Sequence, residues 1–130
     1  MEIVVIHAAL MAAGTIIMAG TAVIAMTQRK KRWWLKVHRP FGVAGALSMT
    51  AGLFAIALMP DGRGSSLIPL IHDIVGGSAI ALVCSAPILG ILMFRLKKKW
   101  MRPAHRWAGR LAILIAFTNL TLGLFITGLI

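Results

Sequence analysis

Charge is scarce in this 130-residue sequence. Asp, Glu, Lys and Arg together make up 13% of it, against about a quarter of an average soluble domain. Only three residues are acidic, tyrosine is absent, and the single cysteine excludes an intrachain disulfide framework. This shortage of polar residues excludes an ordinary water-soluble domain. Any chemistry must therefore take place inside an apolar bundle or at its ends.

Long apolar runs make up most of the chain, which is 59% hydrophobic with a mean hydropathy of +0.90. A membrane-spanning helix needs about 20 consecutive, mostly apolar residues. Residues 1–130 hold four such runs and predict one all-α, integral membrane domain, with helices over residues 3–27, 37–58, 69–94 and 103–130. The connections are short, including a turn-rich segment at 60–66, so we expect an antiparallel up-and-down four-helix bundle.

The net charge of +11 is concentrated at one end of the predicted bundle. Of the 14 Lys and Arg residues, 13 lie in or beside segments 28–39 and 95–110, together with all four tryptophans. Arg63 and all three acids fall on the opposite side. This is the positive-inside pattern with an aromatic belt, and it argues against nucleic-acid binding. We expect a multi-pass protein of the cytoplasmic membrane, with both basic loops in the cytoplasm and both termini outside.

The two basic segments also repeat one another. Each contains, at the same spacings, a basic pair followed by Trp, then a His-Arg pair, then a glycine: Lys31-Arg32-Trp33, His38-Arg39 and Gly42 in one, Lys98-Lys99-Trp100, His105-Arg106 and Gly109 in the other. Both copies run in the same direction along the chain. The bundle is therefore predicted to be a duplicated two-helix unit, a parallel repeat of the kind that membrane proteins use.

Each predicted helix carries one histidine near one of its ends. His7 and His72 belong to the first and third helices on the outer side, and His38 and His105 to the second and fourth on the basic side. In a sequential four-helix bundle these helices are diagonal, so each pair is expected to face across the axis at one depth. Two imidazoles on opposite sides of a plane complete a six-coordinate haem iron. The sequence thus predicts two b-type haems per chain, with these histidines as axial ligands.

Residues beside the histidines agree with a flat macrocycle. Gly42, Gly76 and Gly109 each lie one helical turn after a histidine, where a missing side chain leaves room for a porphyrin. Small residues also simply let membrane helices pack closely. His7 departs from the pattern, because Met11 lies at the matching position. The arginines that follow the inner histidines, Arg39 and Arg106, are candidates to bind haem propionates, an anionic substrate or lipid headgroups.

Other readings of the histidines are weaker. A single intramembrane histidine often only hydrogen-bonds a neighbouring helix, but four that pair by depth and by diagonal favour ligation. A zinc site needs three or four protein ligands, and two histidines per face are too few. A cation or metal transporter needs an ionisable group deep in the membrane, yet none of the three acids lies in the middle of a predicted span.

The placement of one histidine on each of four consecutive helices resembles the core of the cytochrome b561 family, the transmembrane ascorbate-dependent and ferric reductases. The resemblance implies the same pairs, His7 with His72 and His38 with His105. It also implies electron transfer from a cytoplasmic donor such as ascorbate to an external acceptor such as ferric iron or a quinone radical. It leaves open whether the chain is itself an oxidoreductase, and we assign no catalytic residue.

Members of that family usually have six helices, whereas this chain has only the core four. Its flanks would then be covered by lipid, by a second copy as a homodimer, or by another membrane subunit. The alternative function is accordingly a haem-bearing anchor subunit of a larger redox complex. The basic residues at the inner end, including Lys36, Arg102 and Arg110, are where the family's ascorbate-like anion would bind.

Overall fold

Four long helices make up the fold in the computed structural model, which describes residues 2–58 and 67–128. They are α1 (Glu2–Thr27), α2 (Trp34–Ala57), α3 (Leu67–Leu96) and α4 (Met101–Ile126), and these residues contain no strand. Each helix is long and apolar enough to cross a membrane. The predicted all-α membrane fold is confirmed.

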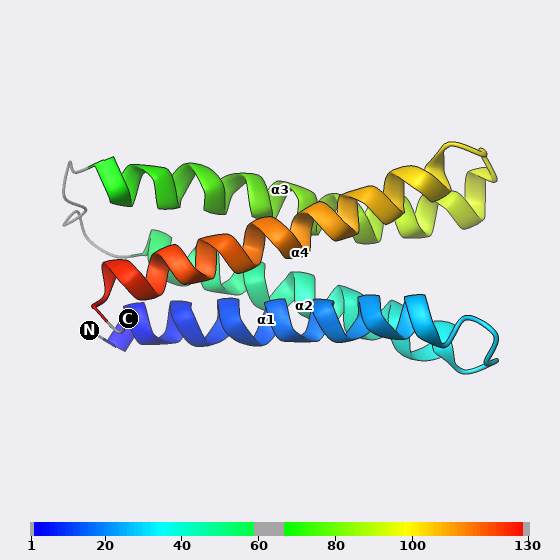
Figure 1. Cartoon of the computed structure of the whole chain (residues 1–130), viewed down its shortest axis with the longest axis horizontal. Coiled ribbons are helices and arrows are strands. Elements are labelled where there is room, and N and C mark those ends of the chain that lie inside the picture. The colour runs from blue at the N-terminus through cyan, green and yellow to red at the C-terminus, as the bar shows by residue number, and fades with distance from the viewer. Residues whose placement is uncertain (1, 59–66, 129–130) are drawn as a thin grey trace.

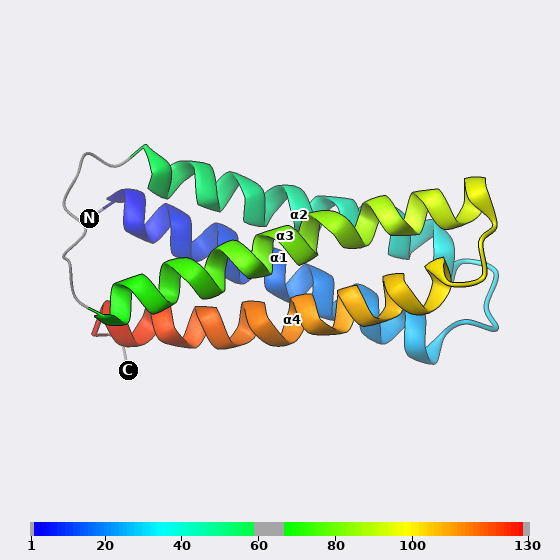
Figure 2. The same cartoon turned by 90° about the horizontal axis from the view of Figure 1, so that it is seen from above.

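The helices run up and down along one axis. Figures 1 and 2 show the two chain ends at one end of the bundle and the α1–α2 and α3–α4 turns at the other. Helices pack most closely within each of these two hairpins, and the hairpins meet where α1 lies beside α4 and α2 beside α3. In the described part of the chain, α1 and α3, like α2 and α4, make no close main-chain contact. These are the diagonal pairs that the sequence predicted.

Helix ends differ from the predicted bounds in a consistent way. Helices α2 and α4 begin at Trp34 and Met101, so the first turns extend into the basic segments. Helix α3 ends at Leu96 because Lys97 takes a left-handed backbone conformation, with φ of 51°, which stops a helix. Helix α4 ends at Ile126 and a turn follows at 127–128, so the predicted extension of the fourth helix to 130 is too long. The predicted turn at 60–66, with Arg63 in it, and residues 129–130 lie outside the described residues.

Glycines allow α1 and α2 to approach each other closely. A methyl group built on Gly14 would lie 2.8 Å from the carbonyl oxygen of Gly45, and one on Gly45 would lie 3.1 Å from the carbonyl oxygen of Gly14. Main chain therefore packs against main chain at this crossing, as small residues permit in membrane helices.

A narrow core lies between the two hairpins, and most other apolar side chains face outward. Its buried members come from all four helices: Met11, Met18, Ala46, Met49, Ala79, Val83, Ala112 and Ala116. Large side chains such as Ile16, Phe54 and Phe117 are two-thirds exposed. In water this surface would be costly, but in a bilayer it meets lipid tails.

Replacing Gly14 by Ala is expected to lower the free energy of unfolding by about 1–3 kcal/mol, because the added methyl presses on the α2 main chain, which cannot rotate away. Gly20→Ala is the matched control, since a methyl there meets nothing within 4 Å. It should leave stability unchanged or raise it by up to about 1 kcal/mol. Denaturant titration of both variants in detergent measures the difference, and equal effects would contradict the close approach.

Candidate functional site

The four histidines form two pairs, one toward each end of the bundle. The rings of His7 (α1) and His72 (α3) have centroids 6.3 Å apart, and those of His38 (α2) and His105 (α4) are 6.0 Å apart. The ring planes within the pairs meet at 76° and 88°. All four side chains are partly buried. The structure thus brings together the pairs that topology predicted, each joining one helix of each hairpin.

Backbone carbonyls orient three of these rings. The Nδ1–H of His7 donates to the carbonyl of Gly52 at 2.7 Å, and that of His38 donates to Thr21 at 3.1 Å, so α1 and α2 hold one another's histidines. In the second hairpin, the Nδ1–H of His105 donates to the carbonyl of Ala86 at 2.8 Å. A proton on Nδ1 leaves Nε2 as the nitrogen with a free lone pair, which is the state that a metal ligand needs.

The fourth ring differs. Within residues 2–58 and 67–128, the Nδ1 of His72 is buried without a hydrogen-bond partner, and so is the Oδ1 of Asn119 on α4. Buried polar atoms are normally paired, so each of these exceptions calls for an explanation.

The spacing within each pair suits one metal ion between two imidazoles. A bond from an imidazole nitrogen to a transition metal is about 2 Å and the ring centre lies about 1 Å further, so two rings on opposite sides of a metal have centroids about 6 Å apart. No three His, Cys, Asp or Glu side chains gather as a metal site among the described residues. A haem iron, which brings four nitrogens of its own, matches this donor set better than a bare cation does.

The two pairs lie about 21 Å apart along the helices. His38 contacts Thr21, 14 residues beyond His7 on α1, and His105 contacts Ala86, 14 residues beyond His72 on α3. At about 1.5 Å per residue, both hairpins give the same separation. One pair therefore lies toward each face of an apolar layer about 30 Å thick.

The glycines that follow the histidines differ in their surroundings. A methyl group on Gly42 or Gly109 would meet nothing within 4 Å, so open space lies beside α2 and α4 one turn from the inner histidines. Gly76 is different, because a methyl there would lie 2.7 Å from the Nδ2 of Asn119. The structure thus offers room beside the inner pair and fills the place beside His72 with an amide.

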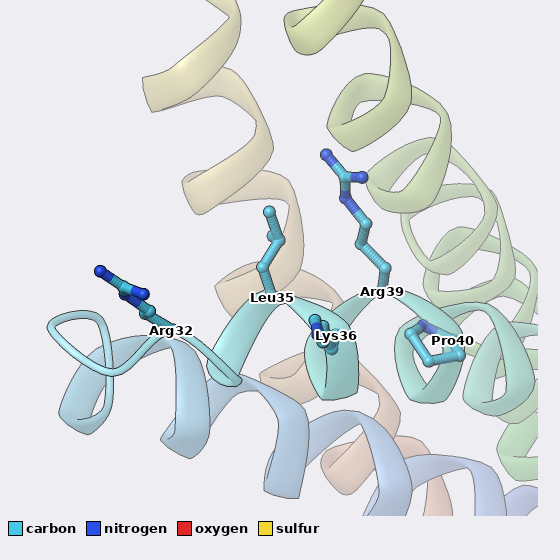
Figure 3. A pocket seen from close by; sticks show the side chains of 5 residues that line it. All are labelled: Arg32, Leu35, Lys36, Arg39 and Pro40. Carbon is cyan, nitrogen blue, oxygen red and sulfur yellow. The ribbon is translucent and has the colours of Figure 1, made fainter.

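Three cations line a cavity of about 470 Å³ at the basic end: its walls are Arg32, Leu35, Lys36, Arg39 and Pro40. Figure 3 shows Leu35 and Arg39 extending in the same direction from α2, with Arg32 in the turn before the helix. The guanidinium of Arg39 lies 4.1 Å from the centre of the Phe94 ring on α3. Arg106, predicted as its counterpart on α4, is exposed. The cavity suits an anion, because no carboxylate is among its lining residues.

The structure adds residues that spacing alone did not identify. The ring of Trp34 lies 5.7 Å from that of His38, although the sequence suggested only an interfacial role. Two further glycines contact histidine rings of the neighbouring helix. A methyl group on Gly90 would lie 3.2 Å from the Cε1 of His105, and one on Gly123 would lie 3.1 Å from the Cε1 of His72. Gly90 and Gly123 belong to apolar runs rich in small residues, so nothing in the sequence around them predicts contact with a histidine.

Paired imidazoles within a membrane helix bundle are the arrangement typical of membrane b-type cytochromes. Comparison with protein families agrees: a sequence model described as eukaryotic cytochrome b561 matches residues 6–129, which include all four histidines. The chain belongs to this family. Membership makes it a multi-pass membrane cytochrome that binds b-type haem and serves electron transfer. Neither the curated proteins nor the solved structures compared with the chain gave a match.

Proposed function

We propose that the chain binds two b-type haems, one between His7 and His72 and one between His38 and His105, and passes electrons from one membrane face to the other. The observation that supports this most is the presence of two histidine pairs, with ring centroids 6.3 and 6.0 Å apart, toward opposite ends of one apolar bundle. A bundle with one such pair would serve one face only.

Within each site, the protein supplies ligands and their orientation. The carbonyls of Gly52, Thr21 and Ala86 hold the Nδ1–H of three rings and so keep the ligating nitrogen unprotonated. Helices α2 and α4 leave space beside Gly42 and Gly109 for a flat group. A haem bound between these histidines would supply one-electron redox chemistry.

Electrons enter, on this proposal, at the basic end. A cytoplasmic location for those turns is supported by the 13 cations in and beside the two basic segments, through the positive-inside rule. Arg32, Lys36 and Arg39 around the cavity then attract either the propionates of the inner haem or an anionic donor of the ascorbate type. The acceptor, such as ferric iron or a quinone radical, meets the opposite end, near His7 and His72.

The haem-to-protein ratio of detergent-purified protein tests the proposal. Reduced pyridine haemochromogen spectra are expected to give two haems per chain for the wild type and about one for His7→Ala and for His38→Ala, because each removes one axial ligand. Gln28→Ala, in the turn just after α1, is a control that should keep both haems.

A ratio of one in the wild type would contradict two sites and favour a haem-bearing anchor subunit. A ratio of zero after reconstitution with haem would reject the proposal, leaving the histidines as helix-packing residues.

A further inference from the structure

The unpaired atoms of His72 and Asn119 occur where the internal repeat breaks its own symmetry. Trp33 and Trp100 are equivalent positions, and the same offset makes Asn119 on α4 the counterpart of Gly52 on α2. In the first hairpin, the carbonyl of Gly52 accepts the Nδ1–H of His7. In the second, no such bond to His72 forms within the described residues, and position 119 carries a carboxamide.

Large and small residues are exchanged between the two hairpins around this position. In the first, Met11 lies one turn after His7, and its Sδ would be 3.2 Å from a methyl group built on the facing Gly52. In the second, the residue one turn after the histidine is Gly76, and the large facing residue is Asn119, whose Nδ2 would be 2.7 Å from a methyl on Gly76. Gly76 therefore makes room for Asn119.

This exchange places the only buried carboxamide of the described residues next to an axial-ligand candidate. Asn119 is 3% exposed. Its main chain lies close enough to the His72 ring to act on it as a hydrogen-bond partner, but Nδ1 has no partner of good geometry. Gly123, one turn further along α4, holds the other side of the ring, at 3.1 Å from Cε1. A donor without an acceptor and an acceptor without a donor thus belong to two residues already in contact.

We infer that Asn119 is a positioning residue of the outer site, whose Oδ1 accepts the Nδ1–H of His72. The inference rests on the proposed haem between His7 and His72. It gives that haem one ligand held by a backbone carbonyl and one held by a side chain, whereas both ligands of the inner pair use backbone carbonyls.

A hydrogen-bond acceptor on Nδ1–H makes an imidazole a stronger electron donor to iron, and so favours the oxidised haem. Removing the acceptor should raise the reduction potential of the outer haem alone. If Asn119 only packed between the helices, replacing it would change the free energy of unfolding but not the reduction potential of the outer haem. The potential therefore separates the two roles.

Spectroelectrochemical titration of the purified holoprotein tests the inference, with the outer haem assigned as the component that His7→Ala removes. In Asn119→Leu, the reduced-to-oxidised ratio of the outer haem at a fixed ambient potential is expected to rise about three- to tenfold, the size of one hydrogen bond. A tenfold change corresponds to about 59 mV for a one-electron couple. The inner haem, in the same molecule, is the control and should not shift.

A second variant keeps the test decisive where Leu disturbs packing. Gly76→Met combined with Asn119→Gly copies the Met11–Gly52 pair of the first hairpin and frees the backbone carbonyl at 119 as acceptor. It should keep the outer haem and move its potential back toward the wild-type value.

Two bound haems with unchanged outer potential in Asn119→Leu would overturn the inference, as would loss of the outer haem in both variants. Where Asn119→Leu loses the outer haem, Asn119→Ala takes its place: a raised outer potential there would support the inference, and an unchanged one would overturn it. If the titrations of the wild type and of His7→Ala show the same components, no outer haem is bound between His7 and His72, and the two-haem proposal itself is wrong.

Discussion

Cutting the chain between α2 and α3 is expected to yield two hairpins that stay together only while haem is bound. Packing is closest within each hairpin, and the hairpins share only the narrow core and the α1–α4 and α2–α3 contacts. Each histidine pair, by contrast, joins one helix from each hairpin. On the proposed function, two iron-linked bridges therefore hold the halves together.

Coexpression of segments 1–62 and 63–130, with an affinity tag on the first, measures this. The second segment should copurify at about one to one, with haem. With His7→Ala and His38→Ala together in the first segment, its recovery should fall at least about tenfold, which needs only about 1.4 kcal/mol of lost association energy. Either substitution alone leaves one bridge and should give an intermediate yield.

Gly14→Ala in the first segment is a useful control, because it disturbs packing within a hairpin and leaves all four histidines in place. Recovery that stays at wild-type level without haem would show that apolar packing alone joins the hairpins. The bridging role of the histidine pairs would then be wrong, even if haem binds.

The sequence sufficed to predict the helices and the pairing of the histidines. Apolar runs of spanning length, separated by two basic segments, define helices within a few residues, and short connections enforce an up-and-down order. Once that order is known, the first and third helices are diagonal, as are the second and fourth. Contacts confirm this arrangement, so the nearness of His7 to His72 follows from topology without any knowledge of side-chain packing.

The spacing of residues along the sequence could not predict which residues of neighbouring helices contact each other. The carbonyls of Gly52 and Thr21 carry no side-chain signal, so their role as acceptors appears only when the helices are placed together. The same holds for Gly76. Its position one turn after His72 matches Gly42 and Gly109, yet its neighbour is Asn119 rather than open space. Its place in a haem pocket therefore remains a prediction, whereas its packing against Asn119 is observed.

These differences set the two hairpins of a duplicated bundle apart from one another. The duplicated unit makes the two members of each histidine pair counterparts of one another, at the same 14-residue separation in both hairpins. Departures from symmetry then fall near one pair or the other: Trp34 and the cationic cavity at the inner end, Asn119 at the outer end. On the proposed function, the potentials of the donor and the acceptor set the direction of electron flow, and these departures give the two ends different surroundings for their partners.

Liposomes containing the purified protein are expected to pass electrons from enclosed ascorbate to ferricyanide outside. In His7→Ala and in His38→Ala, the rate should fall at least about tenfold, because either change leaves one face without a haem and half of an apolar layer about 30 Å thick without a carrier. The reduction of ferricyanide, followed by its visible absorption, gives the rate. Gln28→Ala, which leaves both histidine pairs in place, is the matched control.

Both histidine variants must fail for the proposed path to stand, since the two pairs lie in series along the same helices. Protein-free liposomes set the leak rate, and detergent added at the end shows that each preparation holds the same ascorbate. Transfer at the wild-type rate in either variant would mean that electrons reach the outer face without that pair. The proposed path through both histidine pairs would then be wrong.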